Sequence, residues 1–126
     1  YHDEERSYLY FPCFNVSALA NPTLSFSMAY DLEYCRPTAC DTAWIEYSTD
    51  GNTWSKLGSS GSGYNWYNNA TGQVWDSTKK HWHVATIALP TGGTTLRLRF
   101  VMNSDFFTAK DGIAIDDIHV YDKQFG

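Results

Sequence analysis

Residues 23–31, TLSFSMAYD, alternate strictly between large apolar and small side chains. The large side chains are Leu24, Phe26, Met28 and Tyr30, and the small ones between them are Ser25, Ser27 and Ala29. Successive side chains of a β-strand point to opposite faces of a sheet. The stretch therefore predicts a strand with one face in a core and a polar face outside.

Further strand-like segments, separated by turn residues, follow this pattern along the chain. They are SYLYF (7–11), TAWIEYSTDGNTWSKLG (42–58), HWHVATIAL (81–89), TTLRLRFVM (94–102) and DGIAIDDIHVYD (111–122). Residues 42–58 predict a β-hairpin, in which we expect Asp50 to cap the turn at Gly51 and Trp54 to pack in the core. Helical patterns are missing from the series, which favours an all-β fold, an antiparallel β-sandwich of the jelly-roll type.

Length and composition narrow the class of protein. The 126 residues suit a single domain spanning 1–126. A net charge of −5 argues against a general electrostatic attraction to nucleic acid or to an anionic membrane. No apolar run approaches the roughly 18 residues of a membrane span. We therefore expect a monomer that binds neither nucleic acid nor a membrane.

The cysteines point to an oxidising compartment. Cys35 and Cys40 enclose a short loop that contains Pro37. Their spacing permits a local disulfide, which we predict, whereas two thiols without a second pair nearby make a poor zinc site. Cys13 then has no partner among the three cysteines, and it is either a buried thiol or the partner of a cysteine further upstream.

Asp116 interrupts the apolar pattern of the last strand. It has the same parity as Ala114, Ile118 and Val120, so we expect its carboxylate to point inward with them. A buried carboxylate costs several kcal/mol unless it is paired or holds a metal. An ion pair with a buried arginine, capping by backbone N–H groups and metal ligation are the three possible explanations.

The acidic N-terminal segment favours the metal. Arg97 and Arg99 face outward by parity, which disfavours an ion pair with Asp116. Residues 3–5 are all acidic, and carboxylates brought together beside Asp116 and Asp117 would need a cation between them. Oxygen ligands without His or Cys, in an irregular arrangement, select calcium. Backbone capping of Asp116 remains an alternative.

An aromatic segment lies between the predicted strands. Residues 59–80, SSGSGYNWYNNATGQVWDSTKK, begin as a Gly/Ser run and then become rich in rings and Asn. Flat rings bury the apolar faces of sugars at low entropy cost, and amides hydrogen-bond hydroxyls. We predict carbohydrate binding by Tyr64, Trp66, Tyr67, Trp75 and Trp82. A long loop also needs buried anchors, and Trp66 suits that role best.

Other polar residues have two interpretations. The outward-facing Arg97 and Arg99, with Lys79 and Lys80 near the aromatic segment, suit an anionic polysaccharide, or they are surface charges that discourage edge pairing. His81 and His83 share a strand face, but no third zinc ligand is in register.

Catalytic motifs are not evident. The run GSSGSG (58–63) lacks the G-x-S-x-G spacing of a hydrolase nucleophile. We therefore expect a protein that is not an enzyme.

The segments, taken in order, resemble a known family. EERSYLYFPCFNVSAL, NPTLSFSMAYD, WIEYSTDGNTWSKLG, NWYNN, LRLRFVMNSD and DGIAIDDIHVYD are similar to a MAM-like jelly-roll domain, close to the cleaved-adhesin domains of gingipain-type proteases. The chain resembles most the copies in large secreted proteins of surface-gliding and polysaccharide-degrading bacteria. The resemblance covers nearly the whole chain but lacks one or two N-terminal strands of the family pattern.

The resemblance carries expectations about function. It implies a non-catalytic module, secreted or on the cell surface, that binds a polysaccharide or glycan. The alternative is a protein–protein adhesion or structural module of a secreted protease or surface adhesin, in contact with other domains of its parent protein. It also implies a structural calcium ion where the N-terminal segment meets the last strand, held by Asp3, Glu5 and Asp116, with Asp117 as a further candidate.

Overall fold

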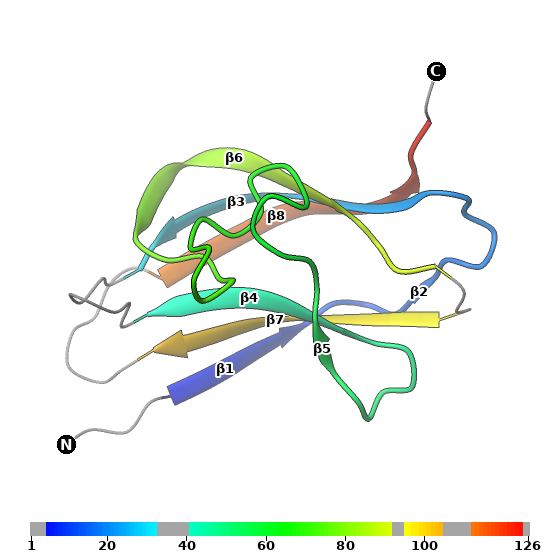
Figure 1. The fold of residues 1–126 in the computed structure, drawn as a ribbon, viewed down its shortest axis with the longest axis horizontal. Helices are drawn as coiled ribbons and strands as arrows, with labels where there is room; N and C mark the ends of the chain where they lie inside the picture. Colours follow the sequence, from blue (N-terminus) through cyan, green and yellow to red (C-terminus); the bar gives the residue numbers. More distant parts are fainter. Residues whose placement is uncertain (1–4, 33–40, 92–94, 105–111, 125–126) are drawn as a thin grey trace.

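Two antiparallel sheets pack face to face to form the molecule (Figure 1). The computed structural model describes residues 5–32, 41–91, 95–104 and 112–124. Within these residues every regular element is a strand, so the predicted all-β sandwich is confirmed.

The larger sheet contains the N-terminal strand and the central hairpin. Its order is β1 (Glu5–Tyr10), β7 (Thr95–Ser104), β4 (Thr42–Ser48) and β5 (Ser55–Lys56). The short β2 (Phe14–Asn15) also pairs with the beginning of β7. The smaller sheet has β3 (Pro22–Asp31) in its centre, between β6 (Thr78–Ala88) and β8 (Gly112–Asp122). Figure 1 shows this smaller sheet as the upper layer.

The core lies between the two sheets, as the alternation of residues 23–31 predicts. Leu24, Phe26 and Met28 of β3 are buried, and Leu98 and Phe100 of β7 are buried opposite them. The rings of Phe26 and Phe100 meet edge to face, with centroids 6.3 Å apart. The serines of β3 therefore lie on the outer face of the smaller sheet.

The predicted inward orientation of Asp116 is wrong, because the core side chains of β8 change parity along the strand. Those that pack against the core are Ile113, Ile115, Ile118 and Val120. Asp116 lies between the two pairs and is exposed. Its carboxylate therefore does not need a metal to offset burial.

A β-bulge at Asp117 causes the change of parity. Ser25 of β3 pairs with His119, whereas Ser27 pairs with Asp116, so β8 has one residue more than β3 in this interval. Asp117 has a φ of 53°, and its N–H donates to Oδ1 of Asp116 at 2.8 Å. An extra residue in one strand exchanges the two faces beyond it. Asp116 thus accepts one local backbone N–H, as the capping alternative expects, but its carboxylate is exposed.

The β4–β5 hairpin fulfils one expectation and contradicts another. Asp50 caps the turn as predicted: its Oδ1 accepts the N–H groups of Asn52 and Thr53, at 2.7 and 2.8 Å. These hydrogen bonds lower the pKa of Asp50 to about 2. Trp54, however, does not pack in the core. It is half-buried on the outer face of the larger sheet, where its ring lies 4.2 Å from the Arg99 guanidinium carbon.

Candidate carbohydrate-binding surface

The five aromatic residues predicted to bind carbohydrate fall into two groups. Trp66, Tyr67 and Trp75 are buried, with exposed fractions of 3%, 1% and 1%. Tyr64 and Trp82 are exposed, at 65% and 56%. Only the second group can present a ring to a ligand without a change of structure.

The three buried rings anchor the long loop in the core. Nε1 of Trp66 and the hydroxyl of Tyr67 both donate to the Leu57 carbonyl, at 2.9 and 2.7 Å. Nε1 of Trp75 donates to the Asn65 carbonyl at 3.0 Å. Burial raises the pKa of the Tyr67 hydroxyl, which accordingly remains a donor. The prediction that Trp66, Tyr67 and Trp75 contact a ligand is therefore wrong, and their role is packing.

Tyr64 is held at the edge of the smaller sheet by backbone pairing. Its N–H donates to the Thr86 carbonyl at 2.9 Å, and the Thr86 N–H donates back at 3.0 Å. Residues paired in this way point their side chains to the same side of a sheet. Thr86 lies between the buried Ala85 and Ile87, so it faces outward, and the Tyr64 ring faces outward with it.

The outer face of the smaller sheet continues this row. Thr86 pairs with Ser25 of β3, and Ser25 pairs with His119 of β8. The row therefore presents a phenol, two aliphatic hydroxyls and an imidazole in sequence across the sheet. In the described part of the chain, no hydrogen bond engages the hydroxyl of Ser25 or Thr86. These groups can exchange hydrogen bonds with the hydroxyls of a sugar.

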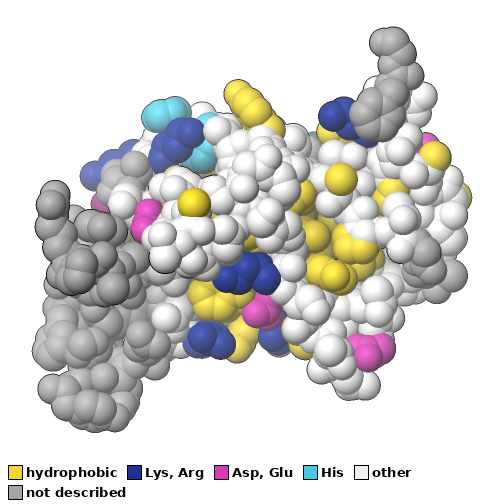
Figure 2. Space-filling model, in the orientation of Figure 1, with side chains coloured by type: hydrophobic (Ala, Val, Ile, Leu, Met, Phe, Trp, Pro, Cys, Tyr) yellow, Lys and Arg dark blue, Asp and Glu magenta, His cyan; other side chains and the backbone are white. Residues whose placement is uncertain are grey.

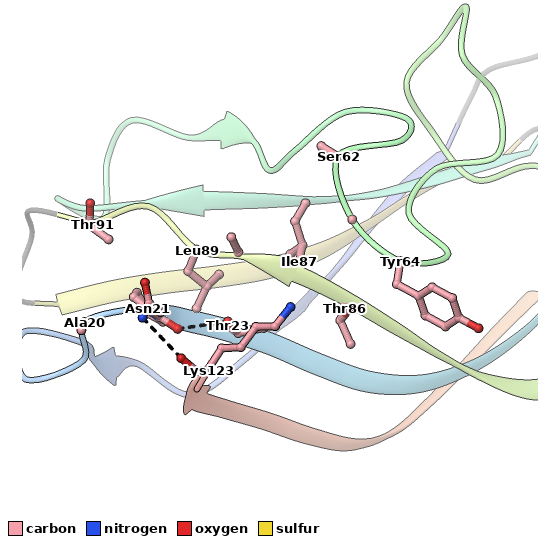
Figure 3. A pocket seen from close by; sticks show the side chains of 13 residues that line it. Ala20, Asn21, Thr23, Ser62, Tyr64, Thr86, Ile87, Leu89, Thr91 and Lys123 are labelled. Carbon is pink, nitrogen blue, oxygen red and sulfur yellow. Dashed lines mark hydrogen bonds between the residues drawn. The ribbon is translucent and has the colours of Figure 1, made fainter. Parts of the chain in front are cut away.

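A pocket of about 370 Å³ adjoins Tyr64 at this edge of the sheet (Figure 3). Its polar lining residues include Asn21, Thr23, Thr86 and Lys123. Figure 3 shows the Lys123 side chain extended along the pocket toward β6, with Tyr64 at the far end. The pocket thus combines an exposed ring, hydroxyls, an amide and a cation.

Trp82 extends the apolar surface along β6. It shares the outward parity of Val84 and Thr86, and both Trp82 and Val84 are exposed. A rise of about 3.3 Å per residue places Trp82 about 13 Å from Thr86 along the strand. Figure 2 shows basic and His side chains gathered at the upper left, where β6 begins, and the beginning of β6 contains Lys79, Lys80 and His81. Trp82 and the neighbouring Tyr64 therefore place two exposed rings along β6, with cations where the strand begins.

The predicted calcium ligands are only partly described. Asp3 and the side chain of Glu5 lie outside the described residues, and so do Cys35 and Cys40 of the predicted disulfide. Asp116 and Asp117 are neighbours on β8, and both are exposed. Among the described residues, no three His, Cys, Asp or Glu side chains are grouped so that they could hold an ion.

The hydroxyl row and Lys123 were not predicted from the sequence. The parity of Ser25 had already indicated an outward-facing position, because it alternates with Leu24 and Phe26. No sequence pattern predicts the pairing of Tyr64 with Thr86, because it joins an irregular loop to a strand. The position of Lys123 beside Asn21 likewise depends on the pairing of β3 with β8.

Comparisons with known proteins do not assign a function to the chain. No protein-family model, curated protein or solved structure matches the chain. Within its described residues, no helix is long and apolar enough to cross a membrane.

Proposed function

We propose that this chain is a non-catalytic carbohydrate-binding module that binds polysaccharide on the outer face of its smaller sheet. The observation that carries the proposal is the Tyr64 ring, which is 65% exposed and fixed beside a polar pocket. We further propose that the module is secreted or displayed on a cell surface, as a monomer within a larger parent protein.

The chemistry of the surface fits a sugar. An exposed ring contributes contact area at low entropy cost when its backbone is already held, as that of Tyr64 is by Thr86. The hydroxyls of Ser25 and Thr86 can serve as both donors and acceptors, as sugar hydroxyls also do. Trp82 offers a second ring farther along β6, which suits a chain of sugars rather than a single one.

Replacing Tyr64 by Ala should weaken retention on a neutral polysaccharide at least tenfold, because the central ring of a binding site typically contributes about 2 kcal/mol. The melting temperature should not change, because the ring is exposed. Affinity electrophoresis in gels containing xylan, hydroxyethyl cellulose or galactomannan measures the effect.

The matched control is Tyr8→Ala. Tyr8 is 42% exposed but lies on β1 of the other sheet, so its loss should leave retention on neutral polysaccharide unchanged. Equal retention of the wild type and the Tyr64→Ala variant on gels that do retain the protein would exclude this surface. Retention on none of the gels would contradict the proposed function.

A protein-interaction module is the second candidate function. The observation in its favour is the exposure of three consecutive large side chains on β1, an edge strand of the larger sheet: Tyr8, Leu9 and Tyr10. Edge strands with exposed apolar side chains can pair with another chain. Capture of a protein partner together with no retention on any polysaccharide would favour this candidate.

We also propose a structural calcium ion held by Asp3, Glu5 and Asp116, with Asp117 as a possible further ligand. The proposal is supported by the acidic N-terminal segment and by the two adjacent exposed carboxylates of β8. Calcium would offset the repulsion between these charges and connect the ends of the chain.

Calcium should therefore raise the melting temperature by several degrees, since a ligand that binds only the folded state stabilises it. EDTA should reverse the rise. Asp116→Ala should remove the difference, whereas His119→Ala, an exposed change on the same strand, should preserve it. Differential scanning fluorimetry of protein stripped of metal gives the comparison. An unchanged melting temperature of the stripped protein on adding calcium would contradict the site.

A further inference from the structure

We propose a second binding site, for a carboxylate-bearing sugar, in a hollow on the larger sheet. The hollow has a volume of about 440 Å³ and lies where the β4–β5 turn meets β7 and the end of β1. The residues that carry the argument are Tyr10, Asn52, Trp54 and Arg97. None of them belongs to the Tyr64 surface, so the two sites stand on different observations.

Arg97 supplies the group that would bind a carboxylate. Its only hydrogen bond among the described residues is from Nη1 to the Cys13 sulfur, at 3.1 Å, and sulfur is a weak acceptor. In the same part of the chain no carboxylate pairs with it. A guanidinium presents its N–H donors in a rigid fork that matches a carboxylate. Arg97 therefore retains most of its donors for a ligand.

The neighbouring Arg99 shows the opposite arrangement. Its Nε and Nη2 both contact Oε1 of Glu46, at 2.7 and 2.6 Å. Its guanidinium carbon also lies 4.2 and 4.4 Å from the ring centroids of Trp54 and Tyr8. These contacts hold the Arg99 side chain against the sheet surface, where it packs on the ring of Trp54. Among the described residues Arg97 has no charged partner, whereas Arg99, on the same face of the same strand, has Glu46.

The turn beside Arg97 is fixed in place. Asp50 accepts the backbone N–H groups of Asn52 and Thr53 and the Ser48 hydroxyl, all on Oδ1. Gly51 has a φ of 82°, and a Cβ there would lie 3.2 Å from Nε of Arg97. The arginine side chain therefore lies directly against a rigid turn, and little conformational entropy is lost when a ligand binds.

The rest of the lining suits a sugar ring. Tyr10 is 61% exposed, and its ring meets that of Trp54 edge to face at 6.0 Å. Asn52 is exposed and offers an amide to hydroxyls. Asp50 keeps its negative charge, with its pKa lowered to about 2, so a ligand with both a carboxylate and hydroxyls fits better than a polyanion without hydroxyls. A uronic acid has this combination.

Arg97→Gln should reduce retention in gels containing alginate or polygalacturonate roughly tenfold, because it removes the charged donors that would hold the carboxylate. The matched control is Arg6→Gln, which removes the same charge from an exposed position on the same sheet, where Arg6 lies over the Trp44 ring at 5.2 Å. Arg6→Gln should be slowed by the polysaccharide as much as the wild type is, relative to a gel without polysaccharide. An equal loss in both variants would show that only net charge matters and would overturn the site.

Cys13 gives an independent readout. It is exposed and lines the hollow, so oligogalacturonate should slow its alkylation by iodoacetamide in the wild type and not in Arg97→Gln. Peptide mass spectrometry separates Cys13 from the other two cysteines. Unchanged alkylation of Cys13 at saturating oligogalacturonate would overturn the site.

The two proposals fail independently of each other. Tyr64→Ala should leave alginate retention intact, and Arg97→Gln should leave retention on neutral polysaccharide intact. Loss of both kinds of retention in Tyr64→Ala would place all binding on the smaller sheet and contradict the second site.

Discussion

Replacing Trp75 by Ala should lower the free energy of unfolding by roughly 3–5 kcal/mol, the usual cost of truncating a large buried ring. Trp75 is 1% exposed. It stacks on Phe100 with centroids 5.7 Å apart and an angle of 6° between the ring planes. Its ring also meets those of Trp66 and Tyr67 at 4.9 and 4.7 Å. Single domains are stable by only about 5–15 kcal/mol, so this loss is a large fraction of the total stability.

The matched control for this prediction is Trp82→Ala. Trp82 is 56% exposed, so the same chemical change should alter stability by no more than about 0.5 kcal/mol. Urea denaturation followed by far-UV circular dichroism compares the two variants without relying on tryptophan fluorescence. A loss below about 1 kcal/mol for Trp75→Ala would contradict its role as an anchor, because buried rings rarely cost so little.

The aromatic loop shows where sequence patterns reach their limit. Composition correctly marked residues 59–80 as unlike a plain linker, yet it did not separate Tyr64 from Trp75. Periodicity sorts side chains into faces only inside regular elements, and residues 59–77 form isolated bridges instead of strands, with β6 beginning at Thr78. The two residues differ in their pairing: Tyr64 pairs with the edge of β6, whereas Trp75 pairs with Ala43 at the start of β4.

The two strands β3 and β8 show the same limit inside regular structure. In β3 the alternation continues without interruption from Leu24 to Tyr30, and the predicted core face is correct. In β8 the core side chains are Ile113 and Ile115 before the bulge and Ile118 and Val120 after it, so the two halves are out of phase, and extending the parity of the second half through the whole strand assigned Asp116 to the wrong face. Adjacent Asp116 and Asp117 are a signal for the bulge, because Asp tolerates positive φ better than most residues.

Gly63→Ala should lower the free energy of unfolding by about 2–4 kcal/mol, the combined cost of overpacking and of weakening two backbone hydrogen bonds. A Cβ on Gly63 would lie 2.3 Å from the Thr86 carbonyl oxygen, which accepts the N–H of Tyr64. The Thr86 carbonyl belongs to the backbone of β6, so it cannot rotate away from the added Cβ as a flexible side chain could. The loop must therefore separate from β6, and Tyr64 must move with it.

The change at Gly63 should also weaken retention on neutral polysaccharide, although Gly63 itself has no side chain to bind a sugar. Gly72→Ala is the control, because a Cβ there meets only ordinary contacts, the nearest being 3.4 Å from a Val74 methyl group. Urea denaturation and affinity electrophoresis of both variants separate the two effects. If Gly63→Ala lowered stability but bound polysaccharide like the wild type, the position of Tyr64 beside Thr86 would not matter for binding. The carbohydrate site would then have to lie away from this edge of the sheet.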